Sequence, residues 1–132
     1  MKTLLTTAAI FVASQAAANE PFGIWETIKD PTGAYFLVDV QPCESNAAKL
    51  CGNVAEVVNS PAEEAVVKAL IGRPVFWDLE KIEENKWANG QVWDAVTDKV
   101  YDSRVTLGKT AMRVEGCVMT FCDGGNWKRP AQ

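Results

Sequence analysis

The sequence predicts a small, mostly β protein: an antiparallel up-and-down barrel of about eight strands with one short helix. Short β-rich segments alternate with turn residues along most of the chain, and only one segment has helical periodicity. Four cysteines and five tryptophans in 132 residues suit a small domain with an aromatic core and disulfide support. Because a meander of hairpins exposes two sheet edges, closure into a barrel is the expected arrangement.

Alternating apolar and polar residues mark the strands. Tyr101, Ser103, Val105 and Leu107 fall on one side of a strand whose other side is polar, the pattern of a half-buried strand. Turn residues such as those at 30–33 and 83–85 separate the strands. The predicted strands are 23–28, 35–40, 50–58, 75–82, 87–93, 101–107, one that includes Met112 and Val114, and a last one that includes Trp127 and Arg129.

One segment, 60–72, has the pattern of an amphipathic helix. Ser60 is placed as an N-cap, Pro61 suits the first helical position, and Glu63 completes a capping box. Gly72 ends the segment, and a proline follows it. We expect the helix to lie against or cap the sheet through an apolar face made of Ala62, Ala65, Val66, Ala69 and Leu70.

Residues 1–18 resemble a secretory signal peptide. Lys2 precedes an apolar stretch at 4–13, and small residues up to Ala18 suit cleavage after that position. The stretch is too short to span a bilayer, and no second apolar run is long enough. We therefore expect one domain, residues 19–132, located in the periplasm or secreted, with no membrane span.

The charge pattern argues against some partners. Acidic residues outnumber basic ones, 17 to 13, and no cluster of Lys and Arg forms a stripe that could follow a phosphate backbone. Nucleic acid is not an expected partner, and an anionic membrane surface is not expected for the same reason.

The four cysteines are Cys43, Cys51, Cys117 and Cys122. They allow three connectivities, and sequence alone does not select one. We favour Cys43–Cys51 and Cys117–Cys122, because each pair closes a short loop where a strand turns. Zinc is a poorer alternative, since the usual Cys-x2-Cys spacing is missing and export favours disulfides.

No catalytic constellation is recognisable. The chain has no histidine, which removes Ser–His and Cys–His nucleophile pairs and His-ligated metals. Asp94, Asp98 and Asp102 are evenly spaced, but on a strand this spacing separates carboxylates by about 13 Å, and the spacing of a calcium loop is absent. We expect no enzyme activity, no metal and no cofactor.

The aromatic residues have two interpretations. Tryptophans can fill the core, or some of them can line a cavity for an apolar ligand. On a regular strand Trp87, Asn89, Gln91 and Trp93 share a face. The candidate ligand-binding residues are Trp87, Trp93, Tyr101 and Ser103.

Two resemblances add to this reading. Gly23-Ile24-Trp25 near the start and Arg129 on the last strand resemble the lipocalin pattern, which implies that the Arg129 guanidinium lies over the Trp25 ring at one end of a barrel. The chain as a whole is more similar to a family of small exported bacterial proteins known as domain of unknown function 2147. The matching pieces are Gly23-Ile24-Trp25, Leu50-Cys51-Gly52, Gly72-Arg73-Pro74, Trp87-Ala88-Asn89-Gly90-Gln91-Val92-Trp93-Asp94, Lys99-Val100-Tyr101, Met112-Arg113-Val114-Glu115-Gly116-Cys117 and Trp127-Lys128-Arg129.

The sequence departs from that family at Ala95 and Asp98, where we expect Pro and Gly, and these changes alter only a turn. The resemblance implies export and a β-rich fold, and it brings no agreed function. Two functional hypotheses follow. The first is an exported envelope protein that binds a small, largely apolar ligand inside a barrel. The second is an interaction or stress-protective module with a solid core that binds another envelope protein or the cell wall through its surface.

Overall fold

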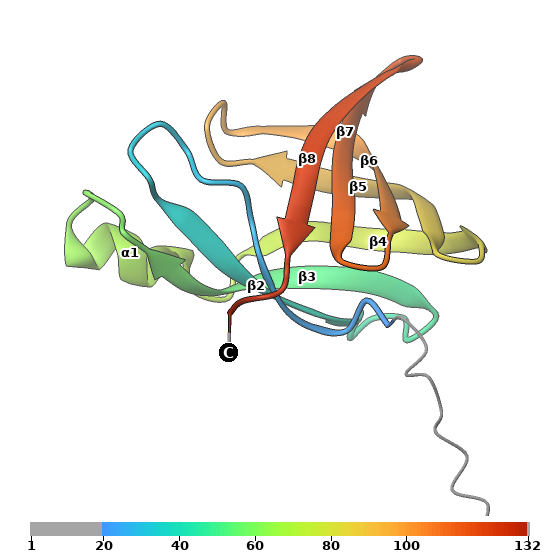
Figure 1. Cartoon of the computed structure of the whole chain (residues 1–132), viewed down its shortest axis with the longest axis horizontal. Helices are drawn as coiled ribbons and strands as arrows, with labels where there is room; N and C mark the ends of the chain where they lie inside the picture. The colour runs from blue at the N-terminus through green and yellow to red at the C-terminus, as the bar shows by residue number, and fades with distance from the viewer. Residues whose placement is uncertain (1–19, 132) are drawn as a thin grey trace, which may run out of the picture.

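The computed structural model describes residues 20–131 (Figure 1). The predicted signal peptide and its cleavage site at Ala18 lie outside these residues. The elements are β1 (Gly23–Glu26), β2 (Tyr35–Pro42), β3 (Lys49–Val58), α1 (Glu64–Leu70), β4 (Pro74–Glu83), β5 (Lys86–Asp94), β6 (Lys99–Leu107), β7 (Ala111–Val118) and β8 (Phe121–Lys128).

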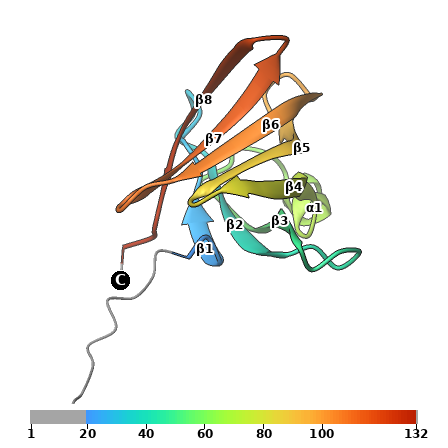
Figure 2. The same cartoon turned by 90° about the vertical axis from the view of Figure 1, so that its right-hand side faces the viewer.

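The eight strands form a closed barrel in chain order, and every neighbouring pair is antiparallel (Figures 1 and 2). This confirms the predicted up-and-down barrel with a single short helix. Because the strands alternate in direction, the connections lie at two ends. We call the end with the β2–β3, β4–β5 and β6–β7 connections the closed end, and the end with the β1–β2, β3–β4, β5–β6 and β7–β8 connections the open end.

The prediction for the helix was wrong at its start and in its packing. The helix begins at Glu64, and the Ser60 hydroxyl accepts the amide of Ala62 at 3.2 Å instead of capping the helix. None of its residues is buried, and α1 stands in the β3–β4 connection at the open end, at the left of Figure 1. The expected apolar face consists mostly of alanines, which offer little area to bury.

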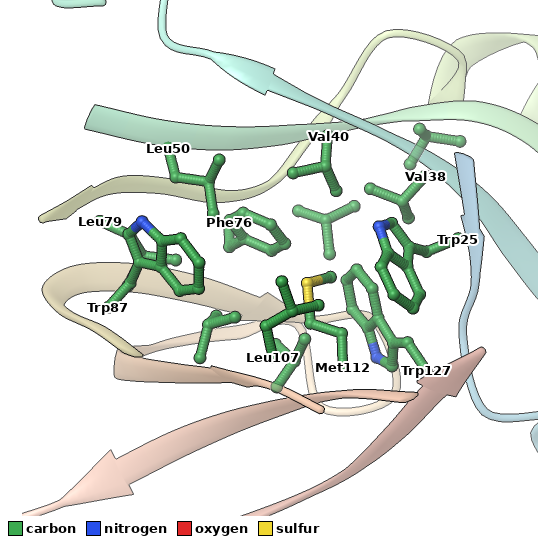
Figure 3. Packing of buried hydrophobic residues seen from close by; sticks show 14 residues of the cluster. Trp25, Val38, Val40, Leu50, Phe76, Leu79, Trp87, Leu107, Met112 and Trp127 are labelled. Carbon is green, nitrogen blue, oxygen red and sulfur yellow. The ribbon is translucent and has the colours of Figure 1, made fainter. Parts of the chain in front are cut away.

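Buried side chains fill the closed half of the barrel (Figure 3). Trp25 and Trp127 lie on one side of this core, Trp87 lies beside Leu79 on the other, and Phe76 lies between them. The core residues are Trp25, Val38, Val40, Leu50, Val54, Val75, Phe76, Leu79, Trp87, Val105, Leu107, Met112, Val114 and Trp127.

The barrel closes along a short seam between β1 and β8, where Glu26 opposite Lys128 is the paired position. Arg129 reinforces this seam. Its guanidinium carbon lies 3.9 Å from the centre of the Trp25 ring. The guanidinium also donates hydrogen bonds to the carbonyls of Ile24, Glu20 and Phe22, at 3.1, 3.0 and 2.8 Å. Partial desolvation lowers the pKa of Arg129, which remains charged.

Both favoured cysteine pairs are disulfides. Cys43–Cys51 fastens the β2–β3 connection at the closed end. Cys117–Cys122 joins β7 to β8 just before the tip of their hairpin at the open end. This hairpin extends beyond the rest of the barrel at the top of Figure 1.

Candidate functional site

A cleft of about 680 Å³ occupies the open end of the barrel. Its floor includes Val75, Val114 and Trp127, which also belong to the core. Most of its lining is apolar. The lining residues are Thr27, Ile28, Phe36, Val75, Val92, Trp93, Asp94, Ala95, Val96, Tyr101, Val114, Gly116, Val118, Phe121, Cys122, Asp123, Gly124, Gly125 and Trp127.

Small residues at inward positions leave this end hollow. On β7 the side that carries the buried Met112 and Val114 continues to Gly116, and on β8 the side that carries Trp127 continues to Gly125. The same sides of these strands carry large side chains in the closed half, whereas Gly116 and Gly125 have no side chain to fill the open half. A Cβ on Gly125 would lie 1.5 Å from a terminal carbon of Ile28, so the Ile28 side chain rests directly on this glycine.

An aromatic stack forms one wall. Trp93 stacks on Phe36, with ring centres 6.2 Å apart and planes 12° apart. Arg73 covers Trp93, with its guanidinium carbon 3.8 Å from the ring centre. Asp98 accepts a hydrogen bond from the indole nitrogen of Trp93 at 2.9 Å and pairs with Arg73 at 3.7 Å. Trp93 is therefore held in one orientation before any ligand arrives.

The tip of the β7–β8 hairpin forms the outermost edge of the cleft. Val118 and Phe121 line it, and both side chains are largely exposed. Met119, at the turn itself, is 94% exposed and does not line the cleft. The disulfide beneath them holds the two strands together at this point.

The β1–β2 connection borders the same end of the barrel. Asp30 shapes it by accepting hydrogen bonds from the Thr32 hydroxyl and from the amides of Thr32 and Ala34. The Thr32 hydroxyl is the main cause that lowers the pKa of the Asp30 carboxyl, and the backbone amides add to the effect. This carboxylate organises the loop and does not line the cleft.

The structure divides the four predicted ligand-binding residues into two pairs. Trp93 and Tyr101 line the cleft. Trp87 and Ser103 are buried away from it: Trp87 belongs to the core, and the Ser103 hydroxyl donates to the carbonyl of Glu115 at 2.8 Å. No buried side-chain nitrogen or oxygen lacks a hydrogen-bond partner within residues 20–131.

The expectation that Trp87, Asn89, Gln91 and Trp93 share a face was wrong. The register of β5 against β6 shifts between Trp87 and Gly90, and Asn89 adopts a left-handed backbone conformation with φ of 62°. This bulge breaks the two-residue period. Asn89 and Gln91 are exposed to solvent, whereas both tryptophans are buried, in separate places.

One group of cysteine and carboxylate side chains lies close together. The Sγ atoms of Cys43 and Cys51 lie near a carboxylate oxygen of Asp78. Because these two sulfurs are joined in a disulfide, they are not the thiolates that bind zinc. In the part of the chain that the structure describes, no helix has the length and apolar character needed to cross a bilayer.

The sequence profile of a bacterial family, described as an uncharacterized protein conserved in bacteria (DUF2147), matches residues 23–129. The chain belongs to this family. The match confirms the resemblance seen in the sequence and covers all eight strands of the barrel.

The DUF2147 chain is also similar in structure to protein HP1028 from the human pathogen Helicobacter pylori, which is described as belonging to the lipocalin family. The TM-score is 0.64 at 18% sequence identity, and the similarity covers 85% of this chain and 84% of that chain. At this identity the comparison establishes a shared lipocalin-like fold. No curated protein matches the sequence.

Several cleft residues were not among those predicted from the sequence: Phe36, Gly116, Phe121, Asp123 and Gly125. A signal for two of them was present. The alternation on β7 places Gly116 in line with Met112 and Val114, and β8 carries adjacent glycines before Trp127. Glycines at inward positions of a small barrel indicate where it is hollow.

Proposed function

We propose that this protein is a non-enzymatic binding protein that holds a small, largely apolar ligand in the cleft at the open end of its barrel. The observation that carries the proposal is the cleft itself, with its mostly apolar lining and its preformed aromatic wall. Ligand sites typically have volumes of about 300–1,000 Å³ and combine an apolar lining with a few polar groups. A barrel of eight strands is wide enough to hold one small ligand where its side chains leave space.

Location outside the cytoplasm, in the periplasm or after secretion, is part of this proposal. Two disulfides in a small domain support it, because such bonds persist in oxidising compartments. The apolar segment at the N-terminus supports it independently. N-terminal sequencing of the exported protein should begin at Asn19, and export with Met1 retained would contradict this part of the proposal.

The binding test uses a neutral apolar dye, N-phenyl-1-naphthylamine, whose fluorescence rises in an apolar site. We expect saturable binding to the purified protein. Phe121→Ser should weaken it about three- to tenfold, since the mutation removes apolar area from the cleft wall. Met119→Ser is the matched control: it lies on the same hairpin tip, outside the cleft, and should leave binding unchanged.

A second candidate function is a protein-interaction or stress-protective module of the cell envelope. The exposed apolar tip at Val118, Met119 and Phe121 favours it, since exposed apolar patches often mark contact sites. In that case the dye does not bind saturably, and native mass spectrometry of freshly extracted protein shows a second polypeptide and no copurified small molecule. An envelope protein captured by the wild type and lost with both Phe121→Ser and Met119→Ser would support this candidate.

A further inference from the structure

The charges that line the cleft are all of one sign. Its two charged residues are Asp94 and Asp123, and neither lysine nor arginine lines it. The whole chain has 13 basic residues, and none of them lines this apolar cleft, whose charged residues are both carboxylates.

Each carboxylate is positioned by the backbone beside it. Asp123 lies opposite Gly116 in the β7–β8 ladder, on the side of β8 that also carries Gly125 and Trp127, and it accepts the amide of Gly124 at 2.8 Å. Asp94 ends β5 and accepts the amide of Val96 at 2.9 Å. Within residues 20–131, neither carboxylate takes part in an ion pair.

Three basic residues at this end of the barrel do not line the cleft. Arg73 lies over Trp93 and is already paired with Asp98. Lys29 extends over the ring of Tyr35, 5.6 Å from its centre. Lys99 faces Asp94 in the β5–β6 ladder but does not line the cleft. The lining of the cleft therefore carries only negative charge, and neither of its aspartates is in an ion pair within residues 20–131.

From this asymmetry we infer the class of ligand: a cationic amphiphile, with an apolar chain or ring in the cleft and a protonated amine at its border, beside one of the two aspartates. The inference rests on the proposed function. Charges interact more strongly next to apolar walls than in bulk water, so two carboxylates at such a site favour a cation and disfavour a fatty acid. A neutral ligand of the same shape should bind with an affinity between that of the cation and that of the fatty acid.

Three probes with the same ten-carbon chain and different head groups test the inference: decylamine, 1-decanol and decanoate. Each competes with N-phenyl-1-naphthylamine at pH 7. We expect decylamine to bind most tightly, 1-decanol less tightly, and decanoate about tenfold or more weaker than decylamine. Raising the salt concentration should narrow the gap between decylamine and decanoate, because the head groups sit near solvent.

Variants that remove one negative charge test whether Asp94 and Asp123 cause the preference for a cationic head group. Asp94→Asn and Asp123→Asn retain a side-chain oxygen for the Val96 and Gly124 amides. The variant at the aspartate beside the amine should weaken decylamine binding severalfold, and neither variant should change the binding of 1-decanol. Asp102→Asn, an exposed aspartate on β6 outside the cleft, is the matched control and should change neither.

The outcomes separate the two proposals. Decanoate binding as tightly as decylamine, or a decylamine affinity unaffected by both variants, would overturn the ligand class and leave the binding function standing. Failure of all three probes and of the dye to bind would overturn the binding function itself. Circular dichroism of each variant establishes that a lost affinity does not reflect a lost fold.

Discussion

Each end of the barrel has an arginine stacked on a tryptophan, and the two stacks are built differently. At the closed end, Arg129 lies 3.9 Å from the ring centre of Trp25, and both side chains donate to backbone carbonyls, including a 2.7 Å hydrogen bond from the Trp25 indole to Pro21. At the open end, Arg73 lies 3.8 Å from the ring centre of Trp93, and both interact with the side-chain carboxylate of Asp98.

The same kind of contact, an arginine stacked on a tryptophan, therefore has a different role at each end of the barrel. Backbone carbonyls are fixed by the fold, so the Trp25 stack joins β1 to the end of β8 and belongs to the core. The carboxylate of Asp98 lies on an exposed turn, where salt screens its interaction with Arg73. We therefore expect the Trp93 stack to shape a wall of the cleft and to contribute less than the Trp25 stack to the stability of the barrel.

The largest expected effect is the loss of the closed-end tryptophan. Trp25→Ala should lower the free energy of unfolding by about 3–5 kcal/mol, because it leaves a cavity inside a filled core. Trp93→Ala should cost less, since the space that it leaves joins the open cleft and water can enter it. Urea denaturation of both variants measures the difference. Equal losses would show that the two ends contribute alike to stability.

Next in size are the two disulfides. Their partners are eight residues apart for Cys43–Cys51 and five apart for Cys117–Cys122. In the chain-entropy model, replacing each pair by alanines costs about 2–3 kcal/mol, with slightly more for the longer loop at the closed end. Thermal unfolding of the two double variants compares them. Finding free thiols or a Cys43 link to β7 or β8 in non-reducing peptide maps would refute the pairing.

The smallest effect distinguishes the two arginines directly. Arg129→Lys should destabilise the protein by about 1–3 kcal/mol, because an ammonium neither stacks flat on a ring nor reaches three carbonyls in a fork. Arg73→Lys should cost less than about 1 kcal/mol, since its ion pair is exposed. Denaturation at low and high salt provides the readout, and only the Arg73 contribution should depend on salt.

The strands were predictable because one physical rule governs them. A barrel wall with one buried side imposes a two-residue period, which is visible in β6, where the buried Ser103, Val105 and Leu107 alternate with exposed or half-buried residues. The helix start was not predictable in the same way. Ser60 offers the same hydroxyl to a helix cap and to a tight turn, and the structure has the turn.

The candidate site was predicted only in part, because the two-residue period of a strand does not give its register against the neighbouring strands. Whether a tryptophan fills a core or lines a cleft depends on which residues face it across the barrel, and that requires the register of every strand. The bulge near Asn89 separates Trp87 from Trp93. Asn89-Gly90 inside a strand is a local sign of such a bulge, but it does not give the register of the residues that follow. Tyr101 lines the cleft because the strand beside it carries Gly116 in place of a large side chain.

The seam between β1 and β8 also determines the order in which the barrel can assemble. Strands β2 to β8 each pair with the preceding strand along the chain, whereas the hydrogen bond from Arg129 to Glu20 joins residues 109 positions apart. Contacts between distant residues carry the greatest loop-closure entropy and slow folding most. We therefore expect the hairpins to form first and the seam last, so that weakening Arg129 accelerates unfolding and leaves the folding rate nearly unchanged. The strength of this contact then determines how long a folded molecule stays folded.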